Sequence, residues 1–215
     1  MLTVGPDPVV VEQMLVDGLL ACPDCGGVLS GWGRTRPRSL RWASGVEERL
    51  RLRRAICPLG GGGGCGRSHV LLPALLLERR LDEVEVIWSA VRVRADGVGW
   101  RRLVAMVGRP ASTVRGWVMR AARRARLIRD RFTEAEHLLA KAAGEDMDRV
   151  ASTGDPLRDA VGQIGVVVAA LRRTRGLAVR TVSPARVVAA LSGGLLLSTK
   201  GFTSLAMVIN TSAHL

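Results

Sequence analysis

Four cysteines, arranged as two pairs, constrain the fold of this chain more than any other feature of its sequence. Cys22 and Cys25 form the first pair, in the pattern C-P-D-C-G-G, and Cys57 and Cys65 form the second, which begins C-P and ends C-G. A C-x-x-C-G turn lets two thiolates converge on one metal ion, and the glycine allows backbone N–H groups to approach the sulfurs. Two such pairs predict a closed four-ligand zinc site, which is structural and supplies no catalysis.

The second pair departs from the usual spacing of two to four residues, because seven residues separate Cys57 from Cys65. The intervening glycine run can bulge outward without moving its ends, and the entropy of loop closure grows slowly with length. We therefore predict that Cys22, Cys25, Cys57 and Cys65 hold one structural Zn²⁺. Two alternatives remain open: His69 replaces one cysteine, or the four reduced cysteines bind no metal.

Residues 100–131 form the most basic stretch, with ten arginines and a single acid, Asp130. Leu103, Val104 and Val107 fall on one side of a short helix. Gly108 can adopt the positive φ of a sharp turn. Pro110 suits the start of a second helix, where its missing N–H is no loss.

Apolar residues recur at helical spacing after this proline, at Val114, Trp117, Val118, Ala121 and Ala125. A short helix, a glycine turn and a second helix with a basic outer face are typical of a helix-turn-helix. A helical hairpin with a solvated arginine face is the alternative interpretation.

The second helix would place its first turns in the major groove of DNA. We predict base-edge contacts by Ser112, Arg115 and Met119, with Arg115 matched to the O6 and N7 atoms of guanine. Flanking residues are predicted to hold phosphates, and these are Arg109, Thr113, Arg120 and Arg123.

The segments around these motifs predict an α+β fold that is mainly α. Between the cysteine pairs, Leu50 and Leu52 alternate with Arg49 and Arg51, which indicates a β-hairpin with one arginine-lined face. A helix over residues 82–94 is expected to pack beneath the helix-turn-helix. The predicted domains are a lead-in (1–20), a zinc ribbon (21–73), a three-helix helix-turn-helix domain (80–131) and a short helical C-terminal region with a partly disordered tail (132–215).

Charge supports a polyanionic partner. The 215 residues carry a formal net charge of +13, and all but two of the 32 basic residues are arginine, whose guanidinium binds phosphates and guanine edges through two hydrogen bonds. The basic residues gather in two blocks, 31–56 and 100–131, which argues for two contact surfaces. No secretory signal or run of bilayer-spanning length is visible, so we expect a cytoplasmic protein without a membrane partner.

Catalysis is not expected. A nuclease that uses two metal ions needs three carboxylates gathered on a strand-rich core, but the acids after residue 131 all lie within residues 134–159, without a strand pattern around them. The prediction is therefore sequence-specific binding of double-stranded DNA. The alternative is a zinc-ribbon adaptor that binds RNA or a protein. RNA is disfavoured by the scarcity of aromatic residues, which stack on unpaired bases.

The order of these motifs, with H-V-L-L-P after the second cysteine pair and G-R-P-A-S-T-V-R-G-W at the helical turn, resembles a bacterial family of uncharacterised zinc-ribbon/helix-turn-helix proteins. That family is similar to the N-terminal DNA-binding part of insertion-sequence transposases, and the resemblance covers residues 20–131. It implies a metal site at the four cysteines and DNA contact by the helix after Pro110. The protein would act as a transcription regulator or a transposase-derived accessory protein, and a homodimer is left open.

Overall fold

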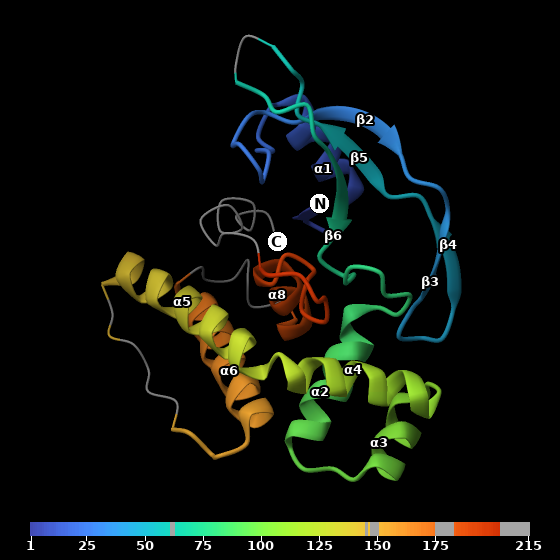
Figure 1. The fold of residues 1–215 in the computed structure, drawn as a ribbon, viewed down its shortest axis with the longest axis vertical. Helices are drawn as coiled ribbons and strands as arrows, with labels where there is room; N and C mark the ends of the chain where they lie inside the picture. The colour runs from blue at the N-terminus through green and yellow to red at the C-terminus, as the bar shows by residue number, and fades with distance from the viewer. Residues whose placement is uncertain (61–62, 145, 147–150, 175–182, 203–215) are drawn as a thin grey trace.

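The computed structural model describes residues 1–60, 63–144, 146, 151–174 and 183–202, and it confirms an α+β fold (Figure 1). The described helices are α1 (Pro8–Val16), α2 (Val84–Ala95), α3 (Trp100–Val107), α4 (Ala111–Arg123), α5 (Ala125–Ala143), α6 (Pro156–Thr174) and α8 (Pro184–Leu191). The described strands are β1 (Leu2–Val4), β2 (Ser30–Arg34), β3 (Arg38–Arg41), β4 (Glu47–Leu50), β5 (Arg53–Ile56) and β6 (Ser68–Pro73).

A four-stranded sheet of order β1-β6-β5-β2 supports the cysteines. Strand β1 runs parallel to β6, with Leu2 opposite Leu71, whereas β5 is antiparallel to both of its neighbours. Strand β1 and helix α1 lie in the predicted lead-in, but their buried residues share one apolar cluster with Cys22 and Cys57. Residues 1–20 are therefore part of the module that holds the cysteines.

The predicted hairpin between the cysteine pairs is present as β3 and β4, and the β2–β5 pair extends the same ribbon (Figure 1). Leu40 and Leu52 are buried against β6 and the chain that follows it, while Arg49 and Arg51 are exposed. The alternation of leucine and arginine thus places the apolar side chains on the core and the arginines in solvent.

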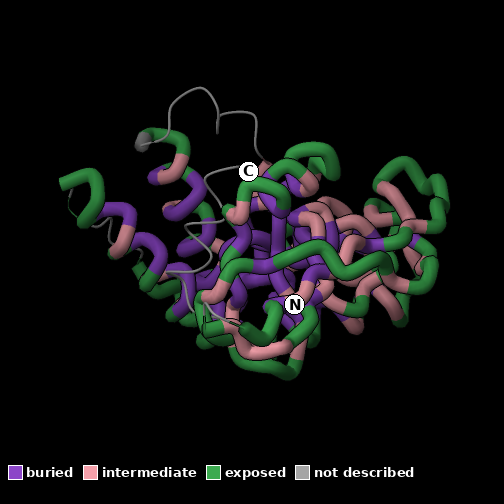
Figure 2. The backbone as a smooth tube through the Cα atoms, turned by 90° about the horizontal axis from the view of Figure 1, so that it is seen from above, coloured by how far each residue is buried: buried purple, intermediate pink, exposed green. Residues whose placement is uncertain are grey.

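The helices build a second and larger core. Helix α2 packs against both α3 and α4, and α5 packs along α6. The buried residues of these helices belong to one apolar core, and the exposed residues lie on the outer sides of the helices (Figure 2). The helical conformation is interrupted at Arg124, so α4 ends before Ala125. The sequence had predicted that Ala125 continues the apolar stripe of α4. Helix α5 runs past residue 131, so the predicted domain boundary falls within a continuous helix.

The C-terminal region closes onto both parts of the molecule. Ser183 caps α8 by accepting a hydrogen bond from the N–H of Arg186, and Gly193 and Gly194 end it with positive φ. The carbonyl of Gly194 accepts a bond of 2.8 Å from the N–H of Glu78. Phe202 packs against the helical core, and the rest of the predicted disordered tail, 203–215, lies outside the described residues.

One detail differs from expectation at the start of α2. The helix begins at Val84, so Asp82, predicted in its first turn, precedes the helix and is buried instead.

Within the described ranges, no helix combines the length and apolar character needed to cross a bilayer.

Candidate functional site

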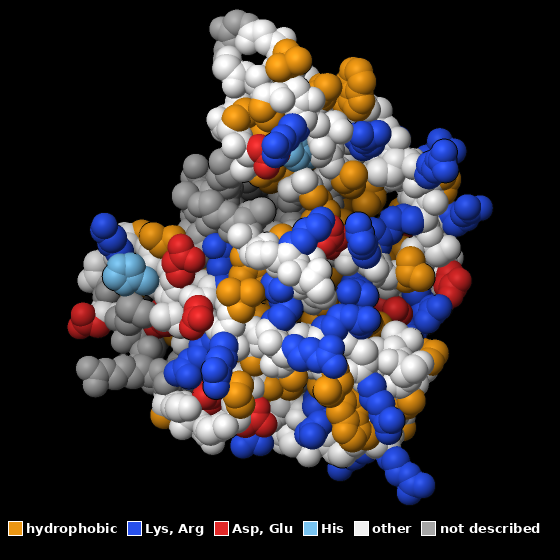
Figure 3. All heavy atoms as spheres, viewed as in Figure 1, with side chains coloured by type: hydrophobic (Ala, Val, Ile, Leu, Met, Phe, Trp, Pro, Cys, Tyr) orange, Lys and Arg blue, Asp and Glu red, His pale blue; other side chains and the backbone are white. Residues whose placement is uncertain are grey.

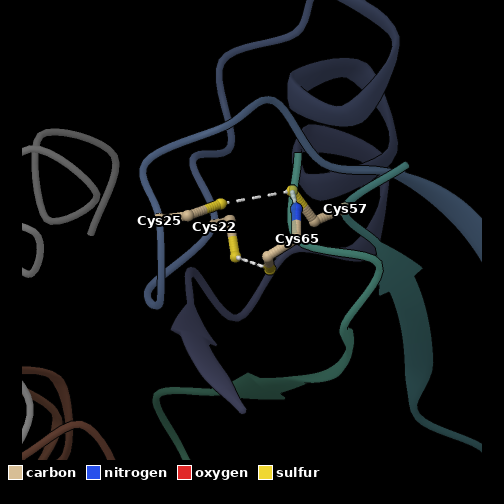
Figure 4. Close-up of side chains that lie close together, drawn as sticks. All are labelled: Cys22, Cys25, Cys57 and Cys65. Carbon is tan, nitrogen blue, oxygen red and sulfur yellow. Dashed lines mark hydrogen bonds between the residues drawn. The ribbon is translucent and has the colours of Figure 1, made fainter. Parts of the chain in front are cut away.

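The four predicted metal-binding cysteines come together at one end of the sheet (Figure 4). Their sulfur atoms all lie within 4.8 Å of one another. Cys22 Sγ is 3.6 Å from Cys65 Sγ, and Cys25 Sγ is 3.5 Å from Cys57 Sγ. Each short distance joins one cysteine of the first pair to one of the second, so the two pairs form a single cluster.

Both halves of the cluster end in the same local structure. Gly26 follows Cys25 with φ +78°, and Gly66 follows Cys65 with φ +72°, a conformation that favours glycine. The N–H of Gly26 bonds to the carbonyl of Cys22 at 2.8 Å and closes the first turn. In the second half a side chain at Gly64 would overlap the Pro58 carbonyl, so glycine is needed where the chain passes close to itself before Cys65.

The donor set fits a tetrahedral metal ion. A Zn–S distance of about 2.3 Å implies sulfur–sulfur distances of about 3.8 Å in a tetrahedron, and the sulfurs here span a comparable range. The N–H of Cys65 lies 3.4 Å from Cys57 Sγ, which is the kind of backbone contact that stabilises a thiolate. Four cysteines at these positions could therefore hold a metal ion.

The environments of the thiols differ across the cluster. Burial raises the pKa of Cys22 to about 12, whereas a backbone hydrogen bond from Gly27 lowers the pKa of Cys25 to about 7. For Cys57 the N–H of Cys65 favours the thiolate, but burial and the Cys25 thiol leave its pKa raised. A metal ion must displace these protons, so metal affinity is expected to fall as the pH falls.

His69, the alternative ligand, lies beside the cluster. Its Nε2 atom is 3.4 Å from Cys22 Sγ, and burial lowers the pKa of the ring. It groups with Cys22 and Asp24 as a second possible donor set, which shares Cys22 with the group that contains all four cysteines.

The second candidate surface is formed by α3, α4 and the turn between them. Gly108 adopts φ +63° as the C-cap of α3, and the N–H of Val114 bonds to the Pro110 carbonyl at 3.1 Å to start α4. Val114, Trp117 and Val118 are buried toward the helical core. The predicted stripe is therefore the packed face of α4.

The opposite face of α4 is open to solvent. The three residues predicted to meet base edges, Ser112, Arg115 and Met119, are all exposed. Among the predicted phosphate contacts, Arg120 and Arg123 are exposed and Thr113 is half-buried.

Arg115 lies over an aromatic platform that the sequence did not reveal. The guanidinium of Arg115 lies 5.7 Å from the centroid of the Trp100 ring, and that of Arg94 lies 5.2 Å from the same centroid. Such cation–π contacts limit the orientations of an exposed arginine. Residue spacing gave no signal for this contact, because the three residues come from α2, α3 and α4.

Arg109 requires a correction. It was predicted to hold a phosphate, but its side chain is only 9% exposed, and its Nε lies 2.7 Å from Asp82 Oδ1. Its Nη2 atom also donates to the Trp42 carbonyl at 2.8 Å. Arg109 is thus bonded inside the molecule and is not available to a phosphate in this arrangement.

Comparison with known proteins adds one similarity. Residues 22–100, less than half of the chain, are similar to a family whose model is described as a domain of unknown function (DUF6431). The matched segment begins at the first cysteine and ends at the first residue of α3. No curated protein and no solved structure gives a significant match.

Proposed function

We propose that this protein binds double-stranded DNA in a sequence-specific manner, with α3 and α4 acting as a helix-turn-helix and α4 as the recognition helix. The observation that carries the proposal is the exposed face of α4, which follows a tight glycine turn and is opposite a fully packed stripe. Ser112, Arg115 and Met119 on that face would meet base edges.

The electrostatics of this face favour a polyanion. Arg115, Arg120 and Arg123 are exposed on α4, and Arg101 and Arg102 are exposed on α3. A duplex would release counterions from the phosphates that these groups neutralise, so binding would weaken steeply as salt increases. The roles of transcription regulator and transposase-derived accessory protein both fit this chemistry.

We propose that the cysteine cluster holds a structural Zn²⁺. The ion would be bound by Cys22, Cys25, Cys57 and Cys65 and would tie the chain after α1 to the ends of β5 and of the glycine run. All four positions are taken by protein sulfurs, so no open position is left for substrate.

A binding function is favoured over catalysis by the arrangement of the acids. Within the described residues, the groups of three or more potential metal ligands are both at the cysteine end of the molecule. Asp159 is buried and accepts hydrogen bonds from Ser152 and Thr153, and Glu136 bonds to Gln163. Asp159 also pairs with Arg129 of α5, so both carboxylates serve the packing of α5 and α6.

The test is selection of bound sequences from random duplex DNA, followed by affinity measurements on variants. Arg115→Ala should weaken binding to the preferred site by about 1–3 kcal/mol and relax one base position. Arg123→Ala, the matched arginine control, should weaken all duplexes alike and lower the salt slope by about one unit. A failure to enrich any motif, together with weak and sequence-independent binding, would rule out the proposal.

One observation favours the second candidate, an RNA-binding adaptor. Trp32 on β2 is 56% exposed, in contrast to the buried Trp88 and Trp117, and an exposed indole can stack on an unpaired base. Competition between duplex DNA and single-stranded RNA separates the two functions. Preferential RNA binding that is lost in Trp32→Ala would support the adaptor.

A further inference from the structure

We propose that hairpin β3–β4 and helix α4 contact the same DNA duplex as one rigid surface, which extends the bound site to one side of the bases read by α4. This inference rests on the proposed DNA-binding function and adds a second contact at a fixed spacing. It is carried by a buried ion pair where the hairpin meets the turn before α4, and by exposed arginines on the adjoining hairpin face.

The joint between the two parts is built on Arg109, which directly precedes the N-cap of α4. Its guanidinium bonds to Asp82 at 2.7 Å and to the carbonyl of Trp42, the residue after β3, at 2.8 Å. The Arg109 and Asp82 side chains are only 9% and 7% exposed. The turn before α4 is thus attached both to the hairpin backbone and to a buried acid.

Backbone hydrogen bonds reinforce the same joint. The N–H of Arg41 donates to the Leu81 carbonyl at 2.6 Å, and the N–H of Glu83 donates to the Arg41 carbonyl at 3.0 Å. The N–H of Ala43 also donates to the Glu83 carboxylate at 2.9 Å. These bonds join the hairpin to residues 81–83, directly before α2, and α2 packs against α4, so the spacing between the hairpin and α4 is fixed.

The hairpin face beside the joint carries the arginines. Arg41 lies opposite Glu47, and Arg49 lies two residues beyond Glu47, so these three share one face while Leu40 is buried on the other. Arg41 Nη1 also lies 3.8 Å from Asp82 Oδ1. The face that bears Arg49 therefore borders the joint with α4.

The charges on this face suit phosphates. Arg49 on this face and the nearby Arg36 and Arg51, which lie just outside the two strands, are exposed and, within the described part of the chain, form no ion pair. The nearby acids are already bonded, because Glu47 pairs with Arg41 at 2.9 Å and Glu48 accepts from Trp42 Nε1 at 3.0 Å. Lys and Arg side chains extend over both the ribbon and the α2–α4 region in one view (Figure 3).

The experiment shortens a duplex that contains the preferred site from one end or the other. Truncation of one flank should weaken binding by the wild-type protein, whereas truncation of the opposite flank should not, because the hairpin lies to one side of α4. The double variant Arg49→Ala, Arg51→Ala should bind the long and truncated duplexes equally. Two lost phosphate contacts should lower the salt slope of the variant by about two units. For the wild-type protein, a fourfold increase in salt should therefore reduce the affinity ratio between the long and the truncated duplex about tenfold.

A charge-matched control is the double variant Arg126→Ala, Lys141→Ala, whose exposed residues lie on α5. It should retain the response to flank truncation. Arg109→Met tests the joint and should reduce the flank response while base preference at the α4 contacts is kept. Since Arg109→Met leaves a buried carboxylate, its folded state is checked by thermal unfolding, and the surface double variant provides a test that does not depend on it.

The outcomes separate this inference from the function on which it rests. A protein that shows no preference for any duplex contradicts the DNA-binding proposal itself. A protein that selects a motif but responds equally to truncation of either flank, with or without Arg49 and Arg51, overturns the composite surface and leaves the recognition helix in place.

Discussion

The ion pair between Asp82 and Arg109 should be among the most sensitive points in the structure. The two side chains lie 2.7 Å apart and are 7% and 9% exposed. At an effective dielectric constant of about 20, their gross attraction is about 6 kcal/mol. Loss of solvation offsets much of this gain, so the net contribution is small while both partners are present.

Removing one partner leaves the other buried and unpaired. Asp82→Ala should therefore lower the free energy of unfolding by about 3–5 kcal/mol. Replacing both partners, in Asp82→Leu with Arg109→Met, should cost only about 1–2 kcal/mol, most of it from the Trp42 carbonyl that loses its donor. The double variant is thus expected to be more stable than the single variant Asp82→Ala.

The assay is urea unfolding at one fixed zinc concentration, with the unfolding slope compared among variants. The exposed Arg123→Ala serves as the control and should change stability by no more than about 0.5 kcal/mol. A cost below about 1 kcal/mol for Asp82→Ala, or a double variant less stable than the single variant, would refute the argument that this pair is desolvated.

Three further outcomes are expected. Purified protein should carry about one zinc per chain by elemental analysis, and the Cys22→Ser, Cys25→Ser double variant should lose it; stoichiometric zinc in that variant would contradict the cluster as the site. Gly108→Ala should lower stability by about 1–2 kcal/mol, because φ is +63° there, whereas Gly99→Ala, at φ −66°, should cost less in the same urea unfolding assay. Hydrogen bonds from Ser152 and Thr153 lower the pKa of Asp159 from 3.8 to about 2, so its stabilisation is fully present above about pH 4 and is lost as the pH falls toward 2. Asp159→Asn should therefore reduce the stability difference between pH 5 and pH 2.5. An unchanged difference would argue against this contribution of Asp159.

Much of the architecture could be predicted because it depends on local pattern. The leucine–arginine alternation indicated the hairpin, and the spacing of Val114, Trp117 and Val118 indicated the packed face of α4. Gly108 was expected to adopt a left-handed turn, and the structure confirms this. The cysteine pairs were expected to meet despite the long second spacing, and their sulfurs lie within 4.8 Å of one another.

The contacts that could not be predicted join segments distant in the sequence. Arg109 was expected to contact phosphate because its neighbours are basic, but its partner Asp82 comes from the chain before α2. An acid among many arginines could have suggested an internal ion pair, but spacing alone cannot select the partner. Similarly, Trp32 is exposed because β2 is the edge strand of the sheet and all of its residues are exposed, and the sequence alone does not reveal which strand lies at an edge.

The parallel pairing of β1 with β6 has a consequence for how the chain is synthesised and folds. Leu2 pairs with Leu71, so β1 leaves the ribosome well before its partner strand exists. Hairpin β3–β4 and the helices can form from neighbouring residues, whereas the β1–β6 ladder must close a long loop. We therefore expect the β1 edge of the sheet to form late, and the apolar residues of β1 and α1 to remain exposed to chaperones until β6 has been made.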